Sequence, residues 1–129
     1  MSIFTKIVSG EIPSYKIAED ENHLAFLDIN PNTKGHTLVI PKKEINKLFD
    51  LDKEVYAALM DFSYRVAKAL EKTVPCKRIG MSVIGLEVPH VHVHLIPINI
   101  MNDMRFEKKE QLTNDEFVDL AKEISRNFI

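Results

Sequence analysis

The sequence predicts an α+β domain in which an antiparallel sheet packs against one long helix. Short stretches of strand-forming residues follow one another with brief polar turns between them, which favours antiparallel pairing. A later stretch that ends near Thr73 instead repeats apolar side chains at helical spacing. With 129 residues and 45% apolar content, residues 1–129 are expected to form a single domain with its own core.

The first third of the chain is expected to contain a short helix and three strands. Ser2 is placed to cap a helix that runs to residue 9, and Gly10 is placed to end it. Polar turns and a loop rich in Asn and Pro then separate runs of apolar residues. Strands are predicted over residues 15–18, 23–28 and 36–40.

A long helix occupies the middle of the chain. Asp50 or Asp52 can cap it, and Pro75 stops it because proline cannot continue a helix. Its expected buried stripe has the three- and four-residue spacing of one helical face. The members of this stripe are Val55, Leu59, Phe62, Val66 and Leu70.

Two strands and a last helix complete the predicted order. The strands span residues 78–84 and 88–96 and form a hairpin pair across Gly85. Thr113 and Glu116 form a capping box for the short C-terminal helix. The buried side of that helix is expected to be Phe117, Leu120, Ile124 and Phe128.

Composition narrows the classes of function. The net charge is −2 and the basic residues are scattered, which argues against a nucleic-acid-binding surface. No stretch approaches the length of a membrane span, and residues 1–11 lack the apolar core of a secretory signal, so no membrane partner is expected. The single cysteine, Cys76, cannot form an internal disulfide, which fits a reducing, cytoplasmic location.

The most informative stretch is residues 89–97, where three of the five histidines alternate with aliphatic residues. Side chains on a strand alternate between its faces, so His90, His92 and His94 are expected to share one face. Histidine costs free energy to bury unpaired and titrates near neutral pH, so this arrangement calls for a chemical role. The intervening side chains are expected to face the core: Val91, Val93 and Leu95.

Three explanations of these histidines are open. They are surface residues of a half-exposed strand, ligands of a metal ion, or groups that carry covalent or acid–base catalysis. Three histidines in register disfavour the first explanation. Same-face residues lie about 6.5–7 Å apart along a strand, so two of them reach one zinc ion more easily than all three. Spacing alone does not decide between metal binding and catalysis.

Together with four earlier segments, this stretch resembles the histidine-triad (HIT) family of nucleotide hydrolases and transferases. The segments are IFTKI, GEIP, AFLDINP and GHTLVIPKK, which begin at Ile3, Gly10, Ala25 and Gly35 and follow the family's order. The resemblance extends to residue 97. It implies the HIT-like fold, with an antiparallel five-stranded sheet that is commonly paired in a two-fold homodimer.

The resemblance also implies an enzyme that attacks the α-phosphate of a purine nucleoside 5′-phosphate derivative. A phosphoramidate, an aminoacyl adenylate and a dinucleoside polyphosphate are the candidate substrates. The residue that matches the family's nucleophile, which forms a nucleotidyl-histidine intermediate, is His92. His90 and His94 would assist it, His36 matches the fourth histidine of family sites, and Asp28 matches the acceptor for the ribose hydroxyls. The residues that match the apolar slot for the base are Ile3, Phe4, Ile7, Phe26 and Ile29.

The chain departs from the family pattern in two places. Leu86 and Glu87 stand where many relatives carry polar donors, so a nucleotide-binding module of low turnover is the alternative function. Zinc-bearing relatives have a Cys-x-x-Cys near the start and a histidine after the paired lysines, and no metal or other cofactor is expected here. The corresponding residues in this chain are Ser2, Thr5 and Glu44. The fifth histidine, His23, lies outside every match and is expected at the surface.

Overall fold

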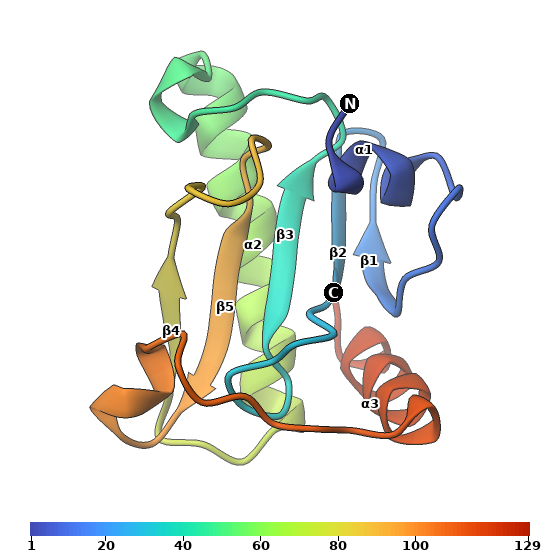
Figure 1. Ribbon diagram of the computed structural model, residues 1–129, viewed down its shortest axis with the longest axis vertical. Coiled ribbons are helices and arrows are strands. Elements are labelled where there is room, and N and C mark those ends of the chain that lie inside the picture. The colour runs from blue at the N-terminus through green and yellow to red at the C-terminus, as the bar shows by residue number, and fades with distance from the viewer.

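The computed structural model describes all 129 residues and consists of one antiparallel sheet with helices on both faces (Figure 1). The strands lie in the order β1-β2-β3-β5-β4, which confirms the predicted α+β class and five-stranded sheet. The strands are β1 (Lys16–Glu19), β2 (His23–Leu27), β3 (Thr37–Pro41), β4 (Arg78–Ser82) and β5 (Val93–Ile98). The helices are α1 (Ile3–Val8), α2 (Lys53–Thr73) and α3 (Asn114–Arg126), with 3-10 turns η1 (Leu48–Asp50) and η2 (Met101–Met104).

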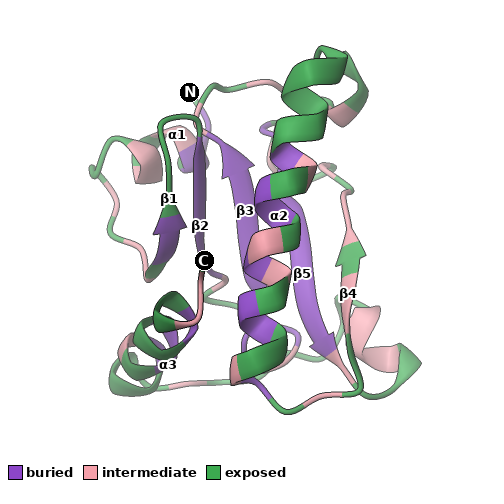
Figure 2. Cartoon of the chain, turned by 180° about the vertical axis from the view of Figure 1, so that it is seen from behind, coloured by how far each residue is buried: buried purple, intermediate pink, exposed green.

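Alternate residues of the strands build two separate cores, one on each face of the sheet. The larger core lies beneath α2, which crosses the buried strands in Figure 2. The smaller core lies on the opposite face beneath α1 and consists of Phe4, Leu24, Phe26, Leu38 and Ile40. Because only the short α1 covers part of this second face, it is the face on which polar side chains can meet a ligand.

The predicted caps at the two shorter helices are confirmed. The Thr5 N–H donates to Ser2 Oγ at 3.1 Å, at the start of α1. The Thr113 N–H donates to Glu116 Oε1 at 2.9 Å, and the Glu116 N–H donates back to Thr113 Oγ1 at 3.1 Å. Asp52 is the residue that precedes α2, but its side chain makes no capping hydrogen bond. None of the helices combines the length and apolar character that a membrane span requires.

The strand predicted over residues 88–96 is wrong at its start. β5 begins at Val93, and its pairing with β4 ends at the pair Ser82 and His94, so residues 83–92 leave the sheet as a connection. His90 and His92 therefore precede the strand. The alternation of faces persists without strand pairing, because the Val91 N–H donates to the Ile45 carbonyl at 2.8 Å and the Val91 side chain stays in the larger core.

Two further expectations are wrong. Val55 is 43% exposed, because the first turns of α2 extend beyond the part of the helix that covers the sheet (Figure 2). His23 is only 5% exposed and therefore is not a surface residue. Its ring stacks on Phe62 of α2 at 5.0 Å between centroids, and its Nδ1 lies 3.0 Å from Asp20 Oδ1. Burial beneath α2 gives His23 a packing role far from the triad.

Candidate active site

Four histidines from three parts of the chain meet on the sheet face opposite α2. His36 directly precedes β3, His94 lies on β5, and His90 and His92 lie in the connection that precedes β5. The ring centroids of His92 and His94 are 4.9 Å apart, and those of His36 and His94 are 5.2 Å apart. None of the four is more than 8% exposed. The structure thus brings together the four histidines that the sequence singled out.

The orientation of His92 is set by a backbone carbonyl. His92 Nδ1 lies 2.7 Å from the carbonyl oxygen of His90, and because a carbonyl only accepts, Nδ1 carries the proton and donates. The other ring nitrogen, Nε2, then keeps its lone pair. The ring of Phe4 packs edge-on against His92, with centroids 4.9 Å apart, and limits its rotation. His92 is therefore held in the tautomer that presents a nucleophilic nitrogen.

His90 anchors this arrangement from behind. Its Nε2–H donates to the carbonyl of Pro41 at 2.8 Å, so its Nδ1 accepts the hydroxyl hydrogen of Ser2 at 2.7 Å. Burial is the main cause that lowers the pKa of His90, so the ring is neutral at pH 7. With both nitrogens engaged and no exposed surface, His90 has no atom left for a substrate and acts by positioning its own carbonyl.

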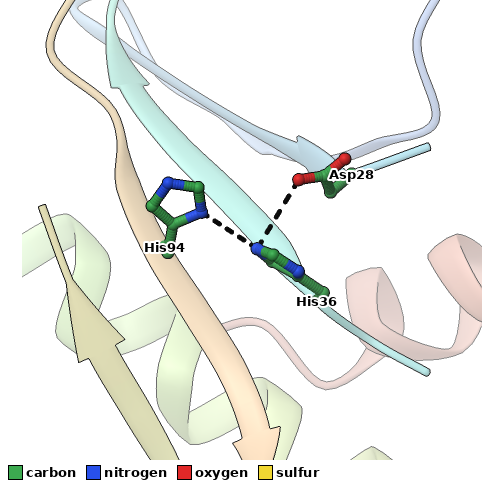
Figure 3. Close-up of side chains that lie close together, drawn as sticks. All are labelled: Asp28, His36 and His94. Atoms are coloured by element: carbon green, nitrogen blue, oxygen red, sulfur yellow. Dashed lines mark hydrogen bonds and ion pairs between the residues drawn. The ribbon is translucent and has the colours of Figure 1, made fainter. Parts of the chain in front are cut away.

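The pair formed by His36 and His94 has the opposite polarity. The Asn32 backbone N–H donates to His36 Nδ1 at 2.9 Å, so neutral His36 carries its proton on Nε2. That Nε2–H donates to His94 Nδ1 at 2.9 Å, as Figure 3 shows, and leaves the proton of His94 on its Nε2. His94 therefore offers an N–H donor to the site where His92 offers a lone pair.

Burial keeps both members of this pair neutral. It is the main cause that lowers the pKa of His36 to about 3 and that of His94 to about 4, and neighbouring cationic groups lower both further. Asp28 Oδ2 lies 3.5 Å from His36 Nε2. Because His36 is uncharged at neutral pH, this contact is a weak polar contact rather than an ion pair. Burial also raises the pKa of Asp28, although the Asn30 N–H donates to its Oδ1 at 2.8 Å.

The side chains of Asp28, His36 and His94 are close enough for a metal ion but do not fit one. One candidate ligand atom from each lies within 4.8 Å of the others. A metal on His36 Nε2 would require the imidazole proton on Nδ1, where the Asn32 N–H already points at it. Two hydrogens would then face each other. The hydrogen bond from the backbone thus favours the hydrogen bond between His36 and His94 over metal coordination.

The residues that correspond to the zinc ligands of some relatives form a hydrogen-bonded cluster instead. Glu44 Oε1 accepts the backbone N–H of Ser2 at 2.5 Å and the hydroxyl of Thr5 at 2.6 Å. These bonds lower the pKa of Glu44 to about 2. The Ser2 hydroxyl continues the cluster to His90. Because this set offers no thiolate and its members already bond to one another, it does not fit zinc.

The predicted apolar slot is only partly assembled. Phe4 and Phe26 pack edge to face with centroids 5.8 Å apart, and Ile7 packs against the same small core. Ile3 and Ile29 are instead 49% and 67% exposed. Phe4 joins this apolar group to the ring of His92, so the two parts of the candidate site are in contact.

The structure adds two residues that sequence reasoning missed. Ser82 pairs with His94 across β4 and β5, and its hydroxyl oxygen is buried without a hydrogen-bond partner. Phe106, from the segment between η2 and α3, packs edge-on against His94 at 4.9 Å. No periodicity or motif marks either residue. Leu86 and Glu87 are both exposed, Leu86 to 91%, so neither contributes a packed wall or a buried donor.

Comparison with known proteins identifies the family. The sequence model of the HIT domain family matches residues 9–102 of this chain. The chain belongs to the HIT family. A HIT-like protein of uncharacterised function from Methanocaldococcus jannaschii is 39% identical, over 96% of this chain and 98% of its own length. The crystal structure of a HIT-like protein from Bartonella henselae is 32% identical and superposes with a TM-score of 0.84, over 98% of this chain and 95% of that one.

Some of the HIT relatives are named for an activity. The adenosine 5′-monophosphoramidase of Saccharomyces cerevisiae is 43% identical over 74% of this chain, which covers 61% of that protein. The HIT family membership and the five-stranded fold confirm the resemblance found in the sequence. An adenosine 5′-monophosphoramidase activity is thus named for members of the family, whereas other similar members are HIT-like proteins of uncharacterised function.

Proposed function

We propose that this protein cleaves a bond to the α-phosphate of a purine nucleoside 5′-phosphate derivative through a covalent nucleotidyl-histidine on His92. The observation that carries the proposal is the hydrogen bond from His92 Nδ1 to the His90 carbonyl. It leaves Nε2 as a neutral nucleophile beside the N–H donor of His94, on the open face of the sheet. A phosphoramidate of AMP is the first substrate to test, because a relative is an adenosine 5′-monophosphoramidase.

The reaction runs in two displacements. His92 Nε2 attacks the α-phosphorus, the new N–P bond forms, and the bond to the leaving group breaks. The His90 carbonyl stabilises the positive charge that develops on the imidazole, because it accepts the Nδ1 hydrogen. Water then attacks the phosphorus and the N–P bond breaks, which releases the nucleoside monophosphate and returns the electron pair to His92. The proton that the water loses balances the proton that the leaving group takes up as it departs.

The neighbouring polar groups bind the phosphate. Neutral His94 donates through Nε2–H to a non-bridging oxygen, where negative charge increases in the transition state. The unpartnered hydroxyl of Ser82, opposite His94 on the same face, offers a second donor. Asp28 accepts hydrogen bonds from the ribose hydroxyls, and the base lies against the apolar residues that border Phe4. These placements complete the role of each predicted residue within the proposal.

A two-fold homodimer is part of the proposal. β4 lies at the edge of the sheet, so its outer hydrogen-bonding groups have no strand beside them, and Met81 is 47% exposed there. An unpaired edge strand is a ready surface for a second copy of the chain. Analytical ultracentrifugation is expected to give a single species of twice the chain mass, whereas a monomer at micromolar concentration would remove this part of the proposal.

Trapping the intermediate tests the proposed chemistry. Acid quenching of the wild-type protein with AMP phosphoramidate labelled at the α-phosphorus is expected to leave label on the protein. His92→Asn is expected to bind AMP, to carry no label and to turn over slower by several orders of magnitude. Label on the His92→Asn protein would place the nucleophile elsewhere. A wild-type protein that binds AMP but neither accumulates label nor turns over would favour the alternative, a nucleotide-binding module of low turnover.

Chelation separates this chemistry from a metal-dependent one. Because both ring nitrogens of His36 and of His90 are occupied by protein hydrogen bonds, activity on the phosphoramidate is expected to survive prolonged treatment with EDTA. Activity that disappears on chelation and returns with stoichiometric zinc would support the metal-site explanation.

A further inference from the structure

The segment between η2 and α3, residues 105–113, crosses the end of the sheet beside the loop that leads to β3 (Figure 1). It lies beyond residues 9–102, which the HIT domain matches. Phe106 in this segment packs edge-on against His94 at 4.9 Å and lies 6.1 Å from His36. The segment therefore supplies a wall of the candidate site that the family domain itself does not contain.

Lys109 is fixed to this wall by two contacts. Its Nζ donates to Asn32 Oδ1 at 2.7 Å and lies 5.0 Å from the centre of the Phe106 ring, within range of a cation–π interaction. Asn32 is buried, and its backbone N–H is the group that orients His36. A second tie joins the segment to the same loop, because the Glu110 N–H donates to the Pro31 carbonyl at 2.9 Å. Lys109 is thus positioned by the loop that also positions His36.

The ammonium of Lys109 has hydrogen-bond donors that no protein group accepts. Its acceptor Asn32 is an uncharged amide, and no carboxylate forms an ion pair with it. An ammonium has three donors, and only one is used. Lys109 is also the one lysine or arginine whose charge affects the pKa values of Asp28, His36 and His94. Since His36 and His94 are neutral at pH 7, Lys109 is a cation in a site whose histidine pair carries no charge.

We infer that Lys109 is a further substrate-binding residue, whose ammonium pairs with an anionic phosphate oxygen of the nucleotide. The inference rests on the proposed function for the identity of the ligand, and it adds the source of positive charge that the histidines do not provide. A phosphate oxygen that Lys109 meets belongs either to the α-phosphate or to a phosphate in the leaving group. Phe106 contacts both the Lys109 ammonium and the His94 ring, so it links the lysine to the candidate site.

Binding measurements test this inference without requiring turnover. Titration calorimetry compares adenosine, AMP and the non-hydrolysable α,β-methylene analogue of ADP on wild type, Lys109→Gln and Lys109→Arg. Lys109→Gln is expected to weaken AMP binding about tenfold or more, as for loss of a charge-assisted hydrogen bond, and to leave adenosine affinity unchanged. Lys109→Arg is expected to retain most of the AMP affinity because it keeps the charge. Lys108→Gln is the matched control, since Lys108 is an exposed neighbour with the same charge and no polar partner.

The ligands also distinguish the two sources of phosphate. If Lys109→Gln weakens AMP and the ADP analogue alike, Lys109 binds the α-phosphate. If only the ADP analogue weakens, it binds the leaving group, and the inference stands in that form. Equal affinities of wild type and Lys109→Gln for both ligands would overturn the inference, as would an equal loss in Lys108→Gln. Absence of label on His92 would instead reject the proposed chemistry while leaving these affinities to be judged independently.

Discussion

The two pairs of histidines in the site leave opposite hydrogen-bonding groups free. In the pair of His90 and His92, each ring donates to a backbone carbonyl, His90 to that of Pro41 and His92 to that of His90, so His92 keeps a free lone pair. In the pair of His36 and His94, the chain begins at a backbone N–H, and His94 keeps a free N–H. A backbone donor or acceptor that bonds to a neutral histidine determines which ring nitrogen carries the proton, and a second ring bonded to the first is determined in turn.

This difference shows that the backbone assigns the chemical roles. His92 and His94 are two residues apart in the sequence and similarly buried, so neither composition nor burial separates them. What separates them is that the connection before β5 exposes a carbonyl to one ring, whereas the loop before β3 exposes an N–H to the partner of the other ring. The polarity of those two peptide groups leaves one histidine with a free lone pair and the other with a free N–H, as the proposed roles of nucleophile and donor require.

The largest effect expected from the comparison of the two pairs is a loss of turnover when the N–H donor of His94 is removed. His94→Asn keeps a polar group near the Nδ1 position only, whereas His94→Gln reaches the position of Nε2 and retains an N–H there. We expect His94→Asn to lower turnover by about 10²–10³, the usual loss for one donor to a developing negative charge, and His94→Gln to lose less. Label is expected to accumulate on both proteins in acid-quench experiments. Wild-type rates in His94→Asn would contradict the donor role.

The next effect concerns Asp28, which lies beside the His36 pair. If its carboxylate accepts from the ribose hydroxyls, Asp28→Asn is expected to weaken AMP binding by about 1–3 kcal/mol, as for a lost charge-assisted hydrogen bond. The preference of the wild type for AMP over 2′-deoxy-AMP should largely disappear in this variant. Asp61→Asn, on the exposed side of α2, is the control. An unchanged preference for the ribose form would remove Asp28 from ribose recognition.

A smaller effect, on stability, is expected when the hydrogen bond from Ser2 to His90 of the other pair is removed. Ser2 caps α1 and donates to His90, so Ser2→Ala removes a cap and leaves a buried acceptor without a partner. The expected loss in the free energy of unfolding is about 1–2 kcal/mol, measured by urea denaturation. Ser9→Ala removes an exposed hydroxyl that donates to the Lys6 carbonyl and accepts a long hydrogen bond from the Glu11 N–H at 3.4 Å, so it is expected to cost much less. Equal losses in the two variants would show that the bond to His90 has no stabilising role.

The last expected effect is a pH dependence of stability, which is small at any one pH near neutrality. The pKa values of His36 and His94 are about 3 and about 4 in the folded protein, below the usual value of 6.5. Between pH 6.5 and 4 these histidines are therefore protonated in the unfolded chain but not in the folded one. Their contribution to the free energy of unfolding is fully present above pH 6.5 and falls as the pH drops toward 4. In His94→Gln this fall is expected to be shallower by at most about 1.4 kcal/mol per pH unit, the value for one proton. Parallel curves for variant and wild type would contradict a depressed pKa at His94.

The sequence predicted most of the fold because its signals are local. Cap residues, prolines and apolar periodicity placed every helix and strand, and the alternation around the triad correctly put Val91, Val93 and Leu95 in the core. The start of β5 was missed because the alternation of faces continues through His90, Val91 and His92 although strand pairing has ended. His23 was misjudged, yet its spacing from Ala25 and Leu27 places all three on the face beneath α2, which is the signal that would have found it.

The parts of the site that were not predicted depend on contacts between residues that are far apart in the sequence. Phe106 and Lys109 reach His94 and Asn32 only because the segment after η2 turns back across the loop before β3. The tautomers likewise depend on contacts such as that between Ser2 and His90, which are 88 positions apart. No periodicity or motif records such contacts, so they emerge only from the folded structure.

The opposite tautomers of His92 and His94 are tested most directly by long-range ¹H–¹⁵N correlation spectra of the histidine rings in the free protein at pH 7. Each ring is assigned from its own His→Gln variant, and the spectra report which nitrogen carries the proton. The account predicts a proton on Nδ1 of His92 and on Nε2 of His36, His90 and His94. A proton on Nε2 of His92 would leave that nitrogen without a lone pair for attack and would contradict the account.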